Sequence, residues 1–182
     1  VEAQLALGET YFDGHDVQQD LAESVKWFRM AADQGNPSGQ YRLALAYLNG
    51  YGVAADPTEA VAWFRRSANQ GSAEACYGLG NLYRQGNGVE IDRAEAVLWY
   101  RKAAEHGHAG AQFRLGIAYA KGDGLPEDQE QAAYWYKEAG GKGHANAQYL
   151  LGVRYAEGRG VETNLELALH WLQKAADQDV SE

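Results

Sequence analysis

Apolar, aromatic and small residues recur along the chain with a fixed period of 36 residues. The tryptophans show the period most clearly, at Trp27, Trp63, Trp99, Trp135 and Trp171. Leucine, glycine and tyrosine columns repeat with the same spacing and without insertions, the last at Tyr11, Tyr47, Tyr83, Tyr119 and Tyr155. Because repeats of about 20–50 residues are typical of stacked helical arrays, the chain is predicted to contain five repeats, at 1–36, 37–72, 73–108, 109–144 and 145–180.

The pattern inside each repeat predicts two amphipathic helices. With positions numbered by the first repeat, the repeating residues of the first half stand at positions 4, 7, 8 and 11, and those of the second half at 24, 27, 28 and 31. Both spacings place these residues on one helical face, which predicts helices at about 2–13 and 21–34 of each repeat. Since one helix pair cannot bury both its apolar faces, stacking must supply the core. We therefore expect an all-α fold, a right-handed α/α superhelix (solenoid) that forms one domain over 1–182, with first helices concave and second helices convex.

Capping residues occur where these helices should begin and end. The second helices are preceded by Asp20, Asp56, Asp92, Asp128 and Asn164. A glutamate follows three residues later at Glu23, Glu59 and Glu95, which predicts a reciprocal capping box. Glycines after each helix allow the left-handed conformation that ends helices. Basic residues at position 29 (Arg29, Arg65, Arg101 and Lys137) are expected to favour the dipole of the second helix.

The overall charge and composition exclude several classes of function. The formal net charge is −9, which argues against sequence-independent nucleic-acid binding, since that needs a basic surface. Cys76 is the only cysteine, so no disulfide within the chain is possible. No apolar run approaches the length of a transmembrane helix, and we expect no membrane insertion. The chain begins with Val1 rather than Met, and we expect a processed protein or part of a longer one.

The repeat consensus resembles that of a known family. It reads A-x-x-x-L-G-x-x-Y-x-x-G-x-G-V-x-x-D-x-x-x-A-x-x-W-[FY]-x-x-A-A-x-x-G, and residues 73–107 show it best, from Ala73 and Leu79-Gly80 to Ala103-Ala104 and Gly107. This pattern is similar to the Sel-one-like repeat (SLR), a relative of the tetratricopeptide repeat with a longer loop within each unit. The resemblance covers nearly the whole chain. It implies a bacterial TPR-like adaptor that mediates protein–protein contacts, and it favours the periplasm, the cell envelope or secretion.

The chain departs from this family pattern at its ends and in its cysteine content. The first repeat has Asp16 where later repeats have a second loop glycine, and the last repeat has Asn164 for Asp and Asp179 for Gly. The paired cysteines of one bacterial branch are absent, so the beta-lactam binding proposed for that branch does not carry over. An apolar C-terminal end is expected from Leu165, Leu167, Leu169 and Leu172. It indicates either truncation from a longer array or self-association.

Binding residues are expected where the first helices break the repeat. Position 5 carries Leu5, Tyr41, Tyr77, Phe113 and Tyr149, which predicts either an aromatic stripe along the groove or packing between helices. Cations also gather on the first helices of this acidic chain, whereas Glu2, Glu9 and Asp13 lie near its start. Such a groove suits a peptide with acidic groups. The candidate partner-binding residues are Tyr41, Arg42, Asn49, Tyr77, Asn81, Arg84, Gln85, Phe113, Arg114, Lys121, Tyr149 and Arg154.

No pattern of catalytic or cofactor-binding residues occurs. His106, His108 and His144 lie at turns between repeats, and a metal shared between them would need a further ligand; we expect no metal and no cofactor. Cys76 is expected to be a buried thiol at position 4 rather than a nucleophile. Two alternatives to a protein-binding adaptor remain. One is a carbohydrate- or cell-wall-binding envelope module that uses the Trp and Tyr rings, and the other is a structural spacer within a larger protein.

Overall fold

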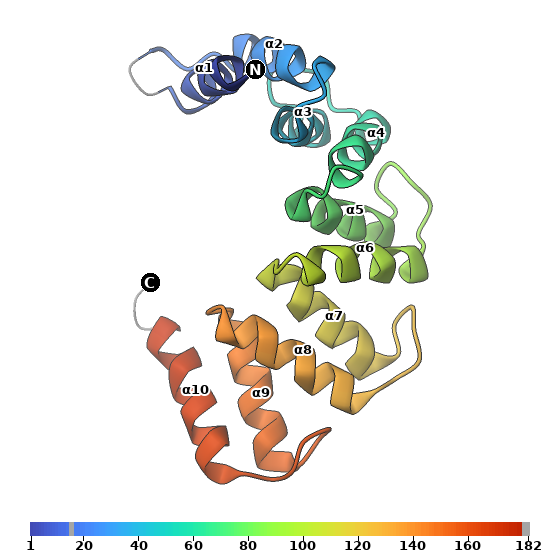
Figure 1. Cartoon of the computed structure of the whole chain (residues 1–182), viewed down its shortest axis with the longest axis vertical. Coiled ribbons are helices and arrows are strands. Elements are labelled where there is room, and N and C mark those ends of the chain that lie inside the picture. Colours follow the sequence, from blue (N-terminus) through green and yellow to red (C-terminus); the bar gives the residue numbers. More distant parts are fainter. Residues whose placement is uncertain (15–16, 180–182) are drawn as a thin grey trace. The chain divides into compact units, whose positions relative to one another are not determined.

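The computed structural model describes residues 1–14 and 17–179, which form ten α-helices and no strand (Figure 1). The helices are α1 (Glu2–Asp13), α2 (Leu21–Asp33), α3 (Pro37–Asn49), α4 (Pro57–Ala68), α5 (Ala73–Gln85), α6 (Arg93–Glu105), α7 (Ala109–Lys121), α8 (Gln129–Gly141), α9 (Ala145–Glu157) and α10 (Leu165–Asp179). Each repeat contributes one odd-numbered and one even-numbered helix. The predicted all-α fold of paired helices is confirmed, and the helix bounds of the first repeat agree with the prediction to within one residue.

The helices belong to two compact units. The first unit, Val1–Ile91, contains α1 to α5, and the second, Asp92–Glu182, contains α6 to α10. The division lies between the two helices of the third repeat. Within each unit, helices that follow one another in the chain pack side by side (Figure 1). That residues 1–182 form a single domain stays a prediction.

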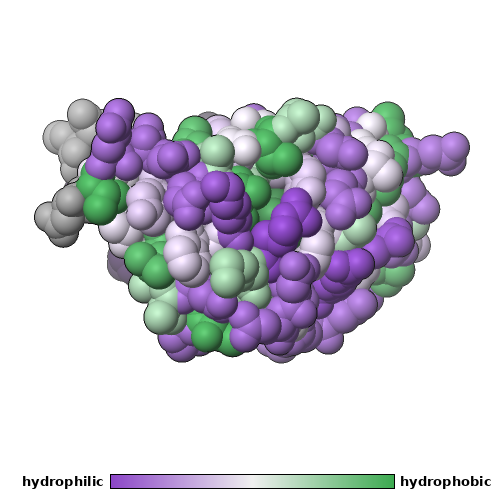
Figure 2. Space-filling model, turned by 90° about the horizontal axis from the view of Figure 1, so that it is seen from above, coloured by the Kyte–Doolittle hydropathy of each residue, from purple (hydrophilic) through white to green (hydrophobic). Residues whose placement is uncertain are grey.

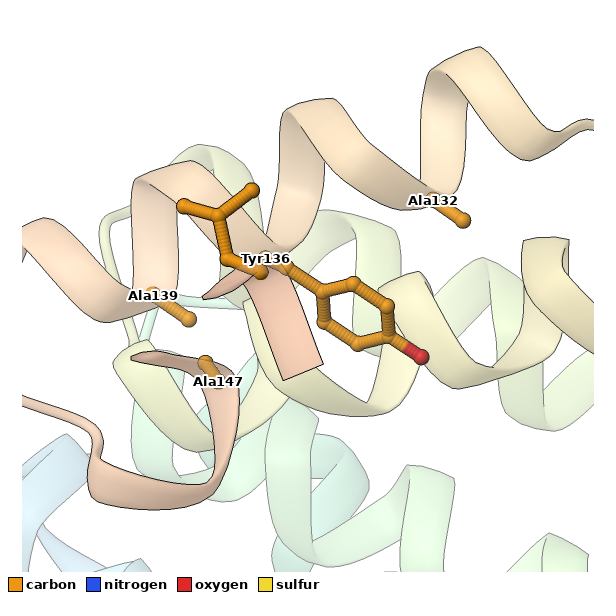
Figure 3. Packing of buried hydrophobic residues seen from close by; sticks show 5 residues of the cluster. Ala132, Tyr136, Ala139 and Ala147 are labelled. Atoms are coloured by element: carbon orange, nitrogen blue, oxygen red, sulfur yellow. The ribbon is translucent and has the colours of Figure 1, made fainter. Parts of the chain in front are cut away.

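The buried core lies between the helices and consists largely of the repeating positions. The leucines of position 7 are completely buried in the later repeats, at Leu43, Leu79, Leu115 and Leu151, whereas Leu7 is 39% exposed. In the second unit, Ala132, Tyr136 and Ala139 of α8 form one buried cluster with Ala147 and Leu151 of α9 (Figure 3). Small residues at the contact allow the close approach of the two helices that the period predicted.

The predicted helix caps form, but the reciprocal capping box does not. Asp56 accepts a hydrogen bond from the backbone N–H of Glu59 at 3.0 Å, as the sequence predicted. The Glu59 carboxylate instead accepts from the indole Nε1 of Trp63 at 2.9 Å. The backbone N–H of Asp56 donates to the carbonyl oxygen of Tyr47 at 2.8 Å, so the box has no donor left to satisfy. In the second and third repeats this glutamate therefore binds the tryptophan one turn further along its own helix.

The second loop glycine is required by close backbone contact between neighbouring repeats. Gly88 has a φ of 74°, in the region that L-residues with a Cβ rarely adopt. A Cβ at Gly88 would lie only 2.3 Å from the carbonyl oxygen of Pro57, at the start of α4. Gly124 stands in the same relation to Arg93, at 2.2 Å. The loop of one repeat thus lies against the first turn of the second helix of the repeat before it.

A hydrogen bond also joins position 29 of one repeat to position 11 of the next. Arg101 of α6 donates from Nη2 to the hydroxyl of Tyr119 on α7 at 2.9 Å. In the first unit, Arg29 is bonded to Tyr47 and Arg65 to Tyr83 in the same way. The arginines of this column therefore have specific partners, in addition to the dipole effect that the sequence suggested.

Candidate partner-binding surface

The predicted binding residues divide between the two units. Those on α3 and α5 belong to the first unit, and those on α7 and α9 belong to the second. There are therefore two candidate surfaces, one on each unit. Figure 2 shows one face of the molecule, on which hydrophilic side chains predominate and hydrophobic ones form small scattered groups.

The aromatic residues of position 5 differ in exposure. Tyr41 is half-buried and packs edge-to-face on Phe64, with 5.8 Å between ring centroids; burial raises the pKa of its hydroxyl. Phe113 stacks on His144, with 4.3 Å between ring centroids. Packing between helices, one of the two predicted alternatives, thus describes Tyr41 and Phe113.

Tyr77 and Tyr149 complete this aromatic column. Tyr77 is partly buried. Tyr149 is 54% exposed and lines a cleft of about 300 Å³ next to Leu172 of α10. The column is therefore not a uniform stripe, and Tyr149 offers the most accessible ring.

The polar residues on α3 and α5 are only partly available to a ligand. Arg42 forms an ion pair with Glu9 of α1, with 2.6 Å between Nε and Oε1, so the acidic start and the first predicted cation neutralise each other. Asn49 is exposed and donates to the carbonyl oxygen of Leu45. Arg84 is half-buried, and its Nε is buried without a hydrogen-bond partner. Asn81 and Gln85 are half-buried and exposed, respectively.

The cations of the second unit lie in different surroundings. Arg114 is half-buried and lies near His144, whose pKa is lowered by burial and, to a lesser extent, by the Arg114 charge. Lys121 is the exposed last residue of α7. Arg154 is only 8% exposed, and its guanidinium lies over the ring of Tyr136 at 5.1 Å from the centroid.

The structure brings two of the predicted cations together with residues that the sequence did not single out. Lys121 and Arg154 line one cleft of about 690 Å³ in the second unit. Gln129, Tyr136 and Arg159 also line it. The sequence did contain one signal, because position 10 carries Thr10, Ala46, Leu82 and Ala118 in the other repeats and arginine only at Arg154.

The histidines between repeats act as helix caps. His108 Nδ1 accepts from the backbone N–H of Ala111 at 3.1 Å, and His144 Nδ1 accepts from that of Ala147 at 3.3 Å. Within the described part of the chain, no group of three or more His, Cys, Asp or Glu residues is placed to hold a metal. Cys76 is buried, and its Sγ lies 3.9 Å from the carbonyl oxygen of Ala68. His15 lies outside the described residues.

Two of the tryptophans are covered by packing and by neighbouring cations. Trp63 and Trp99 are 5% and 7% exposed. Arg66 lies over the ring of Trp63 at 4.2 Å from the centroid, and Lys102 lies over Trp99 at 4.0 Å. These two rings therefore have no open face on which a sugar ring would stack.

Comparison with known proteins identifies the class to which this fold belongs. The Sel1 repeat family matches at residues 1–36, 37–72, 73–108, 109–144 and 145–180. A search of curated proteins finds no match to the sequence. Among solved structures, the chain is similar to a protective antigen of uropathogenic Escherichia coli that displays an SLR fold, with 41% identity, a TM-score of 0.93 and coverage of 97% of this chain and 38% of that protein.

Two further solved structures place the chain within this fold. A Sel1 repeat protein from Oxalobacter formigenes is 38% identical, with a TM-score of 0.91 and coverage of 97% of this chain and 72% of that one. Cysteine-rich protein B of Helicobacter pylori shares only the fold, at 21% identity and a TM-score of 0.57 over 74% of this chain and 96% of that one.

The chain belongs to the Sel1 repeat family, as the sequence pattern predicted, and it spans little more than a third of the Escherichia coli protein. Its fold is the all-α solenoid of five 36-residue repeats that characterises its structural neighbours. Sel1 repeat proteins are generally non-catalytic scaffolds that mediate protein interactions. No helix within the described residues is long and apolar enough to cross a membrane.

Proposed function

We propose that this protein is a non-catalytic scaffold that binds an acidic peptide or protein segment through the first helices of its repeats. One observation carries the proposal. In a chain of net charge −9, the first helices bear several cations, and of these first-helix cations only Arg42 takes part in an ion pair between described residues. Cations that lack an internal partner attract acidic ligands and raise their rate of association.

Peptide binding with matched charge variants tests this proposal. The probes are short synthetic peptide libraries that carry Asp and Glu, or Asn and Gln, at the same positions. The double variant Arg84→Glu/Arg114→Glu changes the first helices. The control Lys26→Glu/Lys137→Glu makes the same change of net charge at exposed residues of α2 and α8. We expect saturable binding of the acidic library by the wild-type protein and by the control, and loss of binding in the first variant.

A carbohydrate-binding module and a structural spacer would give results that differ from those of an acidic-peptide scaffold. Equal binding of acidic and amide libraries, or equal effects of the two double variants, would contradict the proposal. A carbohydrate-binding module would instead give reproducible hits on a glycan array, and these hits would persist in Arg84→Glu/Arg114→Glu. A structural spacer would bind none of these probes.

We also propose that copies of the chain associate through α10. Leu165 and Leu169 are 71% and 65% exposed. Position 25, where Leu169 stands, is buried in each earlier repeat, at Val25, Val61, Val97 and Ala133. Sedimentation of the wild-type protein and of Leu165→Glu/Leu169→Glu tests this. We expect dimers or larger species at high concentration only for the wild type, and a wild-type protein that stays monomeric would contradict the proposal.

A further inference from the structure

Arg154 is a buried charge at a position that holds an uncharged residue in every other repeat. Position 10 is filled by Ala46, Leu82 and Ala118 in the second, third and fourth repeats, and these are 4%, 2% and 6% exposed. Arg154 is almost as deeply buried, at 8%. Removing a guanidinium from water is costly unless a partner of opposite charge compensates it. The fifth repeat thus bears a desolvation cost at position 10 that the other repeats avoid.

The internal partners of Arg154 are all uncharged. Its Nη1 donates to the side-chain Oε1 of Gln129 at 2.8 Å, to the carbonyl oxygen of Gln129 at 3.4 Å and to that of Arg159 at 3.2 Å. It also contacts Tyr136, whose ring lies under the guanidinium at 5.1 Å from the centroid. No ion pair within the described residues includes Arg154. The guanidinium is held in place by dipoles while its charge has no anion beside it.

The surroundings of Arg154 form a cleft with an apolar wall and a cationic rim. Ile117 and Leu150 contribute apolar side chains, and Lys121 contributes a further cation. Arg159 contributes another, which is paired with the Glu157 carboxylate at 2.8 Å. The volume of about 690 Å³ lies within the range of about 300–1,000 Å³ that is usual for ligand sites. One carboxylate lines the cleft, that of Glu127, and it accepts a hydrogen bond from Gln129 Nε2 at 2.5 Å.

The equivalent place in the first unit is closed. There, between the first two repeats, Phe12 and Tyr51 meet edge-to-face at 5.7 Å between ring centroids, and a cavity of only about 30 Å³ remains. In the second unit the corresponding residues are Ala120 and Arg159, which leave the space open. The cleft therefore depends on the residues of this pair of repeats and is not formed by every pair.

We infer that the cleft lined by Lys121, Arg154 and Arg159 binds the carboxylate of a peptide, with the apolar part of the same residue against Ile117 and Leu150. Arginine pairs with carboxylates through two parallel hydrogen bonds, which gives both strength and orientation. The Glu127 carboxylate favours a singly charged ligand over a phosphate group, because it would repel the second negative charge. This inference rests on the proposed function and names the site at which one acidic group is recognised.

Calorimetric titration with defined peptides tests the inference and separates the two sources of a carboxylate. One peptide ends in leucine with a free C-terminal carboxylate, the second is the same peptide with an amidated end, and the third is amidated and carries an internal glutamate. Inorganic phosphate is the fourth probe. Preference for the first peptide assigns the cleft to a chain terminus, and preference for the third assigns it to an acidic side chain. Either result supports carboxylate binding.

The decisive variant is Arg154→Leu, because leucine already fills this position as Leu82. We expect Arg154→Leu to weaken binding of the preferred peptide by about tenfold or more, as loss of one partner of a desolvated charge pair does. We expect its melting temperature to stay equal or to rise, since an apolar residue replaces a buried charge. Lys121→Gln should weaken binding by a smaller factor, and the exposed control Lys137→Gln should leave it unchanged.

Several outcomes would overturn the inference. A lower melting temperature of Arg154→Leu with unchanged binding would show that Arg154 is structural. Phosphate that binds as well as the carboxylate peptides would contradict the choice of ligand. Acidic peptides that bind Arg154→Leu normally, but not Arg84→Glu/Arg114→Glu, would refute this site and leave the proposed function standing. If no acidic peptide binds the wild-type protein, the proposed function fails together with the inference.

Discussion

Arg101 and Tyr119 join the third repeat to the fourth by a hydrogen bond of 2.9 Å between Nη2 and the phenol oxygen. Both side chains are half-buried, so water does not fully replace the bond when it is lost. We predict that Tyr119→Phe lowers the free energy of unfolding by about 1 kcal/mol, the typical net value of one hydrogen bond. Urea denaturation measures the change.

The last repeat offers a matched control for this prediction. Tyr155 occupies the same position as Tyr119, but the residue at position 29 before it is Lys137, which is exposed. Tyr155→Phe is expected to change the unfolding midpoint less than Tyr119→Phe. Equal effects of the two substitutions would show that the phenol contributes by itself and not through the arginine.

The side-chain oxygen of Gln112 is buried and lacks a hydrogen-bond donor, and another repeat shows which residue could supply one. Its Nε2 donates to the carbonyl oxygen of Ala104 at 3.2 Å, but its Oε1 is buried without a partner. In the second repeat, Gln70 donates to the equivalent oxygen of Gln40 at 2.8 Å. Lys142 stands at this place in the fourth repeat and donates to the carbonyl oxygen of Gly107 instead. We predict that Lys142→Gln raises the free energy of unfolding by about 1 kcal/mol, measured by urea denaturation.

A second substitution checks the cause of this gain. In a Gln112→Leu background the oxygen is absent, and Lys142→Gln should then give no stabilisation. A gain that persists in that background would have to come from helix propensity or charge, and it would contradict the explanation by hydrogen bonding.

Trp135 Nε1 is a buried donor without a partner, and Gln131 stands where a glutamate accepts from the equivalent indoles at Trp63 and Trp99. We predict that Gln131→Glu stabilises the protein by about 1 kcal/mol through the new hydrogen bond. Thermal unfolding measures it. In a Trp135→Phe background, Gln131→Glu should keep only the effect of a negative charge in the first helical turn, about 0.3–1 kcal/mol. A gain in stability that is as large as in the wild-type background would contradict the hydrogen bond to the indole.

The glycines that follow helices are expected to differ in their tolerance of a side chain. Gly71 has a φ of 89°, and a Cβ added there would meet no atom within 4 Å, whereas a Cβ at Gly88 would lie 2.3 Å from the Pro57 carbonyl oxygen. Gly71→Ala should cost only the strain of the backbone, on the order of 1–3 kcal/mol. Gly88→Ala should cost more, because the loop must also move away from α4. Chemical denaturation of both variants checks the order, and equal losses would show that the contact relaxes freely.

His144 is expected to make stability depend on pH. Burial lowers its pKa in the folded state, and Arg114 lowers it further, so the unfolded chain binds the proton more readily. The contribution of His144 to the free energy of unfolding is then fully present above the ordinary histidine pKa, about 6.5. It is lost as the pH falls through that value towards the lower pKa of the folded state. Unfolding free energies at pH 8 and pH 5 measure this loss. His144→Asn keeps a capping side chain and should flatten the pH dependence, and an unchanged slope would assign the effect to other groups.

The repeat frame was predictable from the sequence because each position recurs five times in the same surroundings. The caps at Asp56 and its equivalents, the helix bounds and the buried leucines all follow from spacing alone. The role of Glu59 did not follow, because the sequence places this glutamate both three residues after the Asp56 cap and one helical turn before Trp63, and does not show which of the two its side chain faces. The two roles differ only in side-chain direction.

The candidate surface was harder to predict, because exposure depends on neighbours that lie far away in the sequence. Arg42 and Arg154 both break the pattern of the first helices, yet one is neutralised by Glu9 and the other is buried beside Tyr136. The space beside Arg154 exists because Ala120 is small, which no property of Arg154 itself reveals. Charge identifies candidates, and packing decides which of them a ligand can reach.

The bond from position 29 to position 11 has a consequence for how such chains change over generations. Each half of the bond belongs to a different repeat, so a duplicated or exchanged segment of 36 residues brings a compatible half to both of its new borders. The border between the fourth and fifth repeats lacks the arginine, since Lys137 stands there, and the cleft with Arg154 lies at that same border. Recombination would therefore preserve the stacking at most borders. It would destroy this cleft whenever the fourth and fifth repeats were separated, so a cleft that binds a ligand would require these two repeats to be inherited together.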